Sequence, residues 1–122
     1  MGDLSENFSR SEFACKCGCG KVIVNHELVD KLQLMRDILG KPMYITSATR
    51  CEKHNSEVGG VKNSAHLSGY AVDIAAKSSS YKYALLDAAF AVGIPRIIIY
   101  KQFIHFDIDP TKAQLICGVA NE

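Results

Sequence analysis

The feature that most constrains this chain is an aspartate in the middle of a short apolar stretch, GYAVDIAA, at residues 69–76. Alternating β-branched, aromatic and small residues are typical of a buried β-strand. Because side chains alternate across a strand, Asp73 shares its face with Ala71 and Ala75, and the bulkier residues share the other face. A buried carboxylate requires a partner. We therefore expect Asp73 to face a polar site, in space that the two alanines leave open.

A second stretch of the same kind, FIHFDI at residues 103–108, carries a histidine and another aspartate. His105 and Asp107 lie two residues apart, so they share one face of the expected strand. If the two strands are neighbours, His105 converges with Asp73. His66 lies in the polar segment before the first strand and can fold back onto both. The sequence therefore predicts a cluster of two imidazoles and one carboxylate.

Such a cluster matches the ligand set of a catalytic zinc ion. Three protein ligands leave one tetrahedral position free for water, whose pKa the metal lowers toward ~7. Each histidine taken alone is more simply explained as a capping or core residue. The joint pattern of His66, Asp73 and His105 favours the metal.

The rest of the pattern predicts one α+β domain over residues 1–122, with a small central antiparallel sheet flanked by helices. The expected helices are capped at their ends by serine or asparagine and by glycine. The tail, TKAQLICGVANE, carries no usable motif. The expected elements are a helix that begins after Asn25 and ends at Gly40, a strand at 43–48, a short helical turn and loop after Arg50, a strand at 69–76, a helix from about 78 to Gly93, and a strand pair at 95–100 and 102–108.

Charge and hydropathy exclude several classes of function. Fourteen Lys and Arg residues balance thirteen Asp and Glu residues, with no basic stripe, so we expect no nucleic-acid partner. No apolar run approaches the ~20 residues that span a bilayer, so we expect no membrane insertion. The opening residues, MGDLSENFSRSEF, are polar and acidic, which predicts no secretory signal peptide and synthesis in the cytoplasm. We expect a monomer.

The five cysteines allow two interpretations. The run CKCGCG contains C-x-C-x-C rather than the C-x2-C spacing of a zinc knuckle. Reduced thiols or one disulfide are the simpler interpretation, and the odd number leaves at least one cysteine unpaired. A structural metal held by this run together with Cys51 is the alternative.

The central motif, SAHLSGYAVDI, resembles the S-x-H-x-x-G-x-A-x-D signature of the zinc D-Ala-D-Ala carboxypeptidases and L-alanyl-D-glutamate endopeptidases. These peptidoglycan peptidases share a fold with the Hedgehog signalling domain. The segment ITSATRCEKHNSEVGGVKN and the strand FIHFDI are similar to the flanking family motifs. The resemblance covers roughly residues 8–108 and is most specific at the central motif.

This resemblance implies a zinc-dependent peptidase that cuts a bond in the peptidoglycan stem peptide. It implies Zn²⁺ as the cofactor and His66, Asp73 and His105 as its ligands. A chain without a signal peptide would reach the cell wall after lysis, through phage assembly or by non-classical export. The alternative is a zinc-bearing module that binds the cell wall, or serves a phage or secretion assembly, without catalysis.

The resemblance also assigns residues around the metal. Arg50 would bind a carboxylate or carbonyl of the substrate, since its guanidinium presents a planar fork of donors. Ser64 and Tyr100 would line the site and hydrogen-bond the substrate. His54 and Asn55 would have structural roles that hold their loop onto the fold.

The general base is where this chain departs from the family pattern. Several relatives carry Glu or Asp three residues before the third ligand, and here that position is Gln102. An amide does not accept a proton at neutral pH. The nearest candidate for the catalytic base is Asp107, which could equally orient a ligand or pair with Arg50.

Overall fold

The computed structural model describes residues 2–60, 62 and 64–118. The elements run in the order η1 (Arg10–Phe13), α1 (His26–Leu39), β1 (Ile45–Ser47), α2 (Glu52–Glu57), η2 (Ala65–Leu67), β2 (Ala71–Ala75), α3 (Ser79–Val92), β3 (Arg96–Ile99), β4 (Phe103–Asp107) and β5 (Leu115–Gly118), where η marks a 3-10 helix. This is an α+β architecture, as expected. Among the described residues, no helix is long and apolar enough to cross a membrane.

The five strands form one sheet in the order β1-β2-β4-β3-β5. The pairs β1–β2, β2–β4 and β4–β3 are antiparallel, which confirms the expected sheet. One detail differs, because β5 comes from the tail without a motif and pairs with β3 in parallel. Its four residues, LICG, are half-buried or exposed at the sheet edge, and so short a strand leaves little hydrophobic pattern to detect.

Both long helices end where their cap residues predict. The Asn25 side chain accepts a hydrogen bond from the Leu28 amide at the start of α1, and the Ser78 hydroxyl accepts one from Tyr81 at the start of α3. Gly40 and Gly93 end the helices in the left-handed conformation, with φ of 69° and 77°. This conformation is strained for side chains with a Cβ, so glycine is favoured there.

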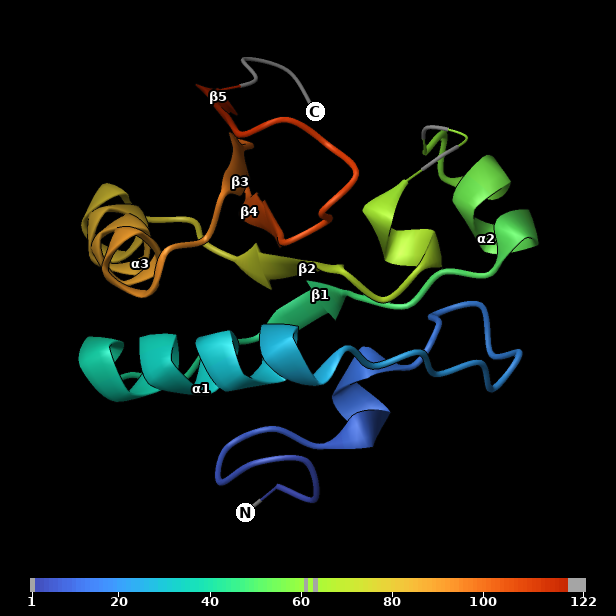
Figure 1. The fold of residues 1–122 in the computed structure, drawn as a ribbon, viewed down its shortest axis with the longest axis horizontal. Coiled ribbons are helices and arrows are strands. Elements are labelled where there is room, and N and C mark those ends of the chain that lie inside the picture. The colour runs from blue at the N-terminus through green and yellow to red at the C-terminus, as the bar shows by residue number, and fades with distance from the viewer. Residues whose placement is uncertain (1, 61, 63, 119–122) are drawn as a thin grey trace.

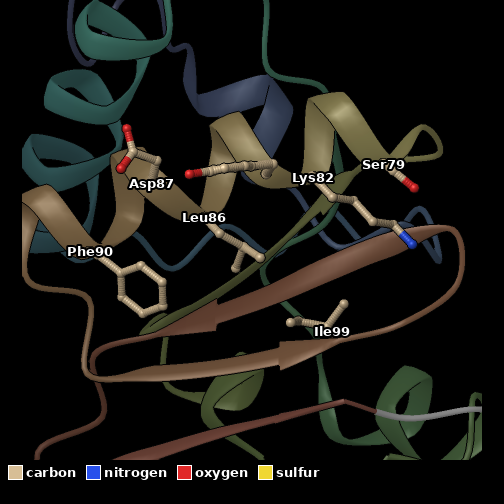
Figure 2. A pocket seen from close by; sticks show the side chains of 7 residues that line it. Ser79, Lys82, Leu86, Asp87, Phe90 and Ile99 are labelled. Carbon is tan, nitrogen blue, oxygen red and sulfur yellow. The ribbon is translucent and has the colours of Figure 1, made fainter.

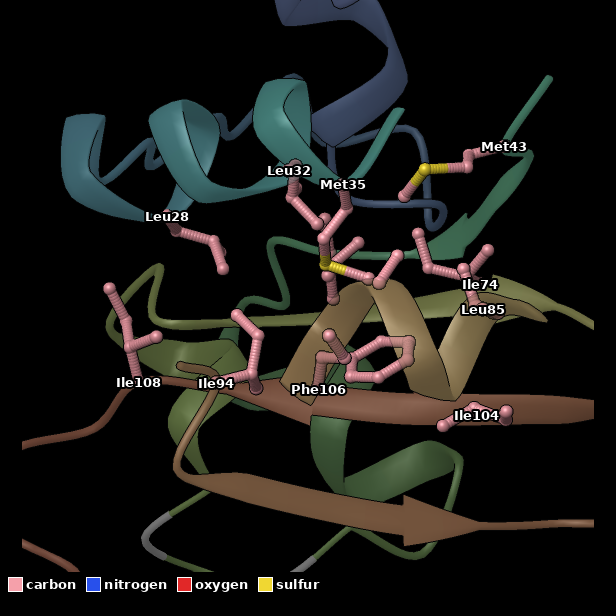
Figure 3. Packing of buried hydrophobic residues seen from close by; sticks show 14 of the residues in the cluster. Leu28, Leu32, Met35, Met43, Ile74, Leu85, Ile94, Ile104, Phe106 and Ile108 are labelled. Atoms are coloured by element: carbon pink, nitrogen blue, oxygen red, sulfur yellow. The ribbon is translucent and has the colours of Figure 1, made fainter. Parts of the chain in front are cut away.

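The core lies between the two long helices and one face of the sheet (Figure 3). Buried apolar side chains of α1 and α3 belong to one cluster with those of β2 and β4. In Figure 1, η2 and α2 lie on the side of β2 away from α1. Burying each large apolar side chain contributes about 1.5–3 kcal/mol. Fully buried members include Leu28, Leu32, Met35, Ile74, Leu85, Ile104 and Phe106.

The register of β2 against β4 separates this core from the polar face. Asp73 lies directly opposite His105, and the apolar pairs on either side of it point into the core. These pairs are Val72 with Phe106 and Ile74 with Ile104. The alternation predicted for both strands is therefore confirmed, and one face of the central strands is left for polar chemistry.

A hollow of about 490 Å³ lies between α3 and Ile99 of β3 (Figure 2). Its lysine, Lys82, donates hydrogen bonds to the carbonyls of Tyr100 and Lys101 in the β3–β4 turn. The hollow is lined by Ser79, Lys82, Tyr83, Leu86, Asp87, Phe90 and Ile99. The polar cluster described below lines a different hollow.

Candidate metal centre

Three elements bring His66, Asp73 and His105 together. Asp73 lies in the middle of β2, His105 in the middle of β4, and His66 in the 3-10 turn η2. One potential ligand atom from each lies within 4.8 Å of the other two. The convergence predicted from strand alternation is confirmed.

His66 reaches the strands because the chain reverses sharply after η2. The Ser64 hydroxyl accepts a hydrogen bond from the His66 amide, and the Arg50 amide donates to the His66 carbonyl at 3.1 Å. Gly69 then turns the chain into β2 with φ of 80°, and a Cβ there would lie 2.7 Å from the Ile23 side chain. A glycine is required at this turn by both its dihedral and the close approach.

The ring of His66 is fixed in one tautomer. Its Nδ1 lies 2.7 Å from the Ala48 carbonyl, which can only accept, so Nδ1 carries the proton. Its Nε2 is buried and has no hydrogen-bond partner among the described residues. The 3.3 Å separation between Nε2 and Asp73 Oδ1 lacks hydrogen-bond geometry. A buried lone pair is thus directed at the cluster without a donor.

His105 is oriented by two carboxylates. Its Nε2 donates to Asp107 Oδ2 at 2.7 Å, and its Nδ1 lies 3.0 Å from Asp73 Oδ1. Burial acts to lower the pKa of His105, but the hydrogen bonds to Asp107 and Asp73 raise it above its usual value. Without a cation, a proton must therefore lie between Nδ1 and Asp73.

Asp73 supplies negative charge at neutral pH. Burial acts to raise its pKa, but contacts with His105 and His66 lower it to about 2. The Asp73 side chain is 6% exposed. A buried carboxylate requires compensating positive charge. The Arg50 guanidinium supplies part of it from 3.4 Å, and a bound cation would supply more.

These residues fit a zinc ion. Neutral imidazole nitrogen and carboxylate oxygen are the donors that zinc binds in catalytic sites. The Nδ1–H of His66 and the Nε2–H of His105 are each held by an oxygen acceptor, as is usual for histidines that bind metals. The lone pair of His66 Nε2 without a hydrogen-bond donor is the observation that a metal ion would explain.

Asp107 is enclosed by donors. Besides His105, it contacts the guanidinium of Arg96 at 3.0 Å, and its Oδ1 accepts a hydrogen bond from the Asp109 amide. Burial acts to raise the pKa of Asp107, but the hydrogen bond to His105 lowers it below its usual value. The cationic partner is Arg96 of β3 rather than Arg50, which was the pairing weighed from sequence.

The sequence pattern predicts only a strand at 95–100 and assigns no role to Arg96 within it. A usable signal existed in the register of the β3–β4 hairpin, in which Arg96 lies directly opposite Asp107. Once the turn near Lys101 is located, counting back along both strands pairs these two residues.

Arg50 lies beside the cluster, as expected. Its Nη2 is 3.4 Å from Asp73 Oδ2, and its Nη1 and Nε donate to the side chains of Asn55 and Ser47. A Cβ on Gly60 would lie 2.0 Å from Asn55 Oδ1, so the backbone passes close over this pair. Asn55 therefore braces Arg50, in line with the structural role expected for it.

A hollow of about 440 Å³ opens above the cluster. Ser64, Arg50 and Tyr100 all line it, together with the cationic side chains of Arg96 and Lys112. Tyr100 stacks on Phe103 with ring centroids 4.5 Å apart. Burial and the charge of Asp73 raise the pKa of the Tyr100 hydroxyl, which therefore stays protonated at neutral pH and can donate a hydrogen bond.

Gln102 occupies the position where relatives carry a carboxylate, but it does not line this hollow. It is exposed in the turn between β3 and β4, and its carbonyl accepts a hydrogen bond from the Ala76 amide.

Comparison with known proteins agrees with this geometry. A family model described as Peptidase M15 matches residues 6–107. The zinc D-Ala-D-Ala carboxypeptidase of Streptomyces albus G is 41% identical over 69 residues, which cover 56% of this chain and 27% of that protein. The chain thus aligns with about a quarter of the relative's length. The match to the family model spans most of the chain, and the chain belongs to the Peptidase M15 family.

Proposed function

We propose that this chain is a zinc metallopeptidase that hydrolyses a peptide bond in the peptidoglycan stem peptide. His66, Asp73 and His105 would hold the metal. The observation that carries the proposal is the buried Nε2 of His66, which faces Asp73 and His105 without a hydrogen-bond donor. Membership of the Peptidase M15 family and the carboxypeptidase relative support the same activity.

Bound zinc would polarise the scissile carbonyl and make water a stronger nucleophile. The protein's part is to hold three donors in place before the substrate arrives. The Ala48 carbonyl fixes the ring of His66, and Asp107 fixes the ring of His105. Both rings are further restrained by burial, with their centroids 5.1 Å apart.

The residues around the hollow would bind the stem peptide. Arg50 presents its guanidinium at the edge of the cluster and would receive a carboxylate or carbonyl of the substrate. Arg96 and Lys112 add positive charge to the lining. The Ser64 hydroxyl and the Tyr100 hydroxyl would contribute hydrogen bonds to the peptide.

For Asp107 the contacts favour orientation of His105 over proton transfer. A general base needs an oxygen that can reach water, and both oxygens of Asp107 already accept hydrogen bonds within the protein. We propose that Asp107 is a positioning residue. Its role as catalytic base stays a prediction that the Asp107→Asn variant separates from positioning.

The test is to incubate the zinc-loaded protein with defined stem peptides, with and without a chelator, and to identify the products by mass spectrometry. A cut that chelation abolishes supports the proposal and names the bond. His66→Ala should abolish the cut. His26→Ala, at an exposed position at the start of α1, is the matched control and should retain it.

A non-catalytic module that binds cell-wall peptides is the second candidate. It is favoured by Gln102 outside the hollow and by the enclosed carboxylate of Asp107. Full zinc occupancy with binding of stem peptides, but without any product, would select this function over hydrolysis.

We further propose that residues 1–122 act as one monomeric domain on the cell wall, without a membrane or nucleic-acid partner. The near balance of positive and negative residues is consistent with the absence of a nucleic-acid partner. The wall would be reached after lysis, by phage assembly or by non-classical export. Size-exclusion chromatography with light scattering gives the molar mass in solution and tests whether the protein is a monomer.

A further inference from the structure

Four of the five cysteines converge at a second place in the fold. Cys15, Cys17 and Cys19 lie in the loop after η1, and Cys51 lies directly before α2. One sulfur atom from each lies within 4.8 Å of the other three. In Figure 1 the loop after η1 (blue) reaches the segment that leads into α2 (green).

The spacing of the sulfur atoms matches a tetrahedral metal site. The Sγ–Sγ distances are 3.4 Å for Cys15 with Cys17, 3.8 Å for Cys15 with Cys51, and 3.6 Å for Cys17 with Cys51. Four thiolates bound to zinc at ~2.3 Å place their sulfur atoms about 3.8 Å apart. The four cysteines are free thiols in the structure.

The backbone around the sulfur atoms is arranged to support thiolates. The Cys51 amide donates to Cys15 Sγ, and the His54 amide donates to Cys51 Sγ, each at 3.4 Å. Amide donors favour the charged form of a thiol. Gly18, between Cys17 and Cys19, and Gly20, directly after Cys19, adopt φ of 86° and 82°, which lets the loop turn around the sulfur atoms.

The loop is fastened at both of its ends to one residue. The Thr49 amide donates to the Phe13 carbonyl, and the Thr49 hydroxyl bonds both the amide and the carbonyl of Ile23. The Cys15 amide also donates to the Lys21 carbonyl across the loop. The thiols of the loop are thereby held against Cys51 by contacts outside the cluster.

We propose that Cys15, Cys17, Cys19 and Cys51 bind a second, structural zinc ion. All four positions of the tetrahedron are filled by protein sulfur, which is the closed arrangement of structural zinc. The site is distinct from the His66, Asp73 and His105 cluster in its donors and in its elements. It rests on the cysteine geometry and does not depend on the proposed peptidase activity.

The position of the site gives it a function in the molecule. Cys51 directly follows Arg50, whose guanidinium contacts Asp73. A metal at the four sulfur atoms would fix the backbone at this point, and so the base of the arginine side chain. The second zinc would thus hold Arg50 in place from outside the hollow, and this consequence for substrate binding rests on the proposed function.

Cobalt substitution tests the site in the parent protein. Co²⁺ bound to thiolates gives a sulfur-to-metal charge-transfer band in the near ultraviolet, which histidine and carboxylate ligands do not give. We expect two metal ions per chain and this band. The His66→Ala variant should keep the band with one metal ion, and the Cys17→Ser/Cys19→Ser variant should lose the band. Cys117→Ser, in β5, is the matched control and should change neither.

Three results would overturn the proposal. One is the absence of the charge-transfer band in the cobalt-loaded parent, which needs no variant to fold. Another is three or fewer titratable thiols in the unfolded, unreduced protein, because one disulfide within the chain would remove two of the five. The last is iron in place of zinc in protein purified without added metal, since four thiolates also suit iron. Failure of the peptidase assay with both metals bound would leave the second site intact.

Discussion

The two clusters of candidate metal ligands differ in what positions them. The His66, Asp73 and His105 cluster is built largely on β2 and β4, whose register is held by apolar pairs on the opposite face. The cysteine cluster is built on a glycine-containing loop and the residue before a short helix. The first can be assembled by the hydrophobic core before any ion binds. The second includes the exposed Cys17 and Cys19 and would draw part of its order from the ion.

The donor sets follow the same division. Two nitrogens and one oxygen at the edge of a hollow leave room for a substrate, whereas four sulfur atoms leave none. We therefore expect loss of the first metal to affect activity far more than stability, and loss of the second to affect stability first.

The largest expected effect is that of His66→Ala on hydrolysis. Removing a ligand removes the metal's electrostatic contribution of several kcal/mol, and each 1.4 kcal/mol is tenfold in rate. We expect kcat/KM on a stem peptide to fall by about 10³-fold or more. The free energy of unfolding in the presence of chelator should change little. If the variant retained activity, His66 would not be a ligand of the catalytic metal.

Next comes the Cys17→Ser/Cys19→Ser variant, measured by denaturant unfolding in the presence of zinc. A ligand at about 1,000 times its Kd stabilises the folded state by about 4 kcal/mol. The parent should therefore be more stable than the variant by about this amount. Chelator should remove most of the difference, while Cys117→Ser should behave as the parent. If the parent remained more stable than the variant in chelator, the lost stability would come from packing of the cysteine side chains rather than from a metal.

A smaller effect is expected for Asp107→Asn. Loss of the carboxylate behind a metal-binding histidine typically lowers metal affinity 10- to 100-fold. We expect this loss of zinc affinity, and recovery of much of the activity at saturating zinc. Unchanged affinity together with lost turnover would instead identify Asp107 as the catalytic base.

The smallest effect is expected for Asn25→Ala, which removes the cap of α1 without touching either cluster. The unfolding free energy should fall by about 1 kcal/mol, because the Leu28 amide loses its acceptor. Zinc stoichiometry should stay the same. A loss of either metal would contradict this expectation, because it would show that the stability of α1 affects metal binding.

Sequence patterns within single strands and helices predicted the features that depend on neighbouring residues along the chain. Strand alternation placed Asp73 and His105 on facing positions, and the caps placed both long helices. The same alternation predicted that Asp107 would share a face with His105.

Features that depend on distant pairing were harder to obtain. The partner of Asp107 was missed because Arg96 lies on another strand, and β5 was missed because it is short and pairs at the edge. The cysteine cluster stayed one of two alternatives because Cys51 is far from the others along the chain. Only the fold brings its sulfur next to theirs.

The direct opposition of Asp73 and His105 makes the site a check on strand alignment. Slipping β4 by one residue would turn His105 into the core and place Ile104 or Phe106 beside Asp73. A misaligned chain would then lose the apolar burial and the ligand set in the same step. The metal ion would bind only the chain in which β2 and β4 are correctly paired. Supplying the ion would therefore shift the equilibrium from mispaired forms toward the correctly paired sheet.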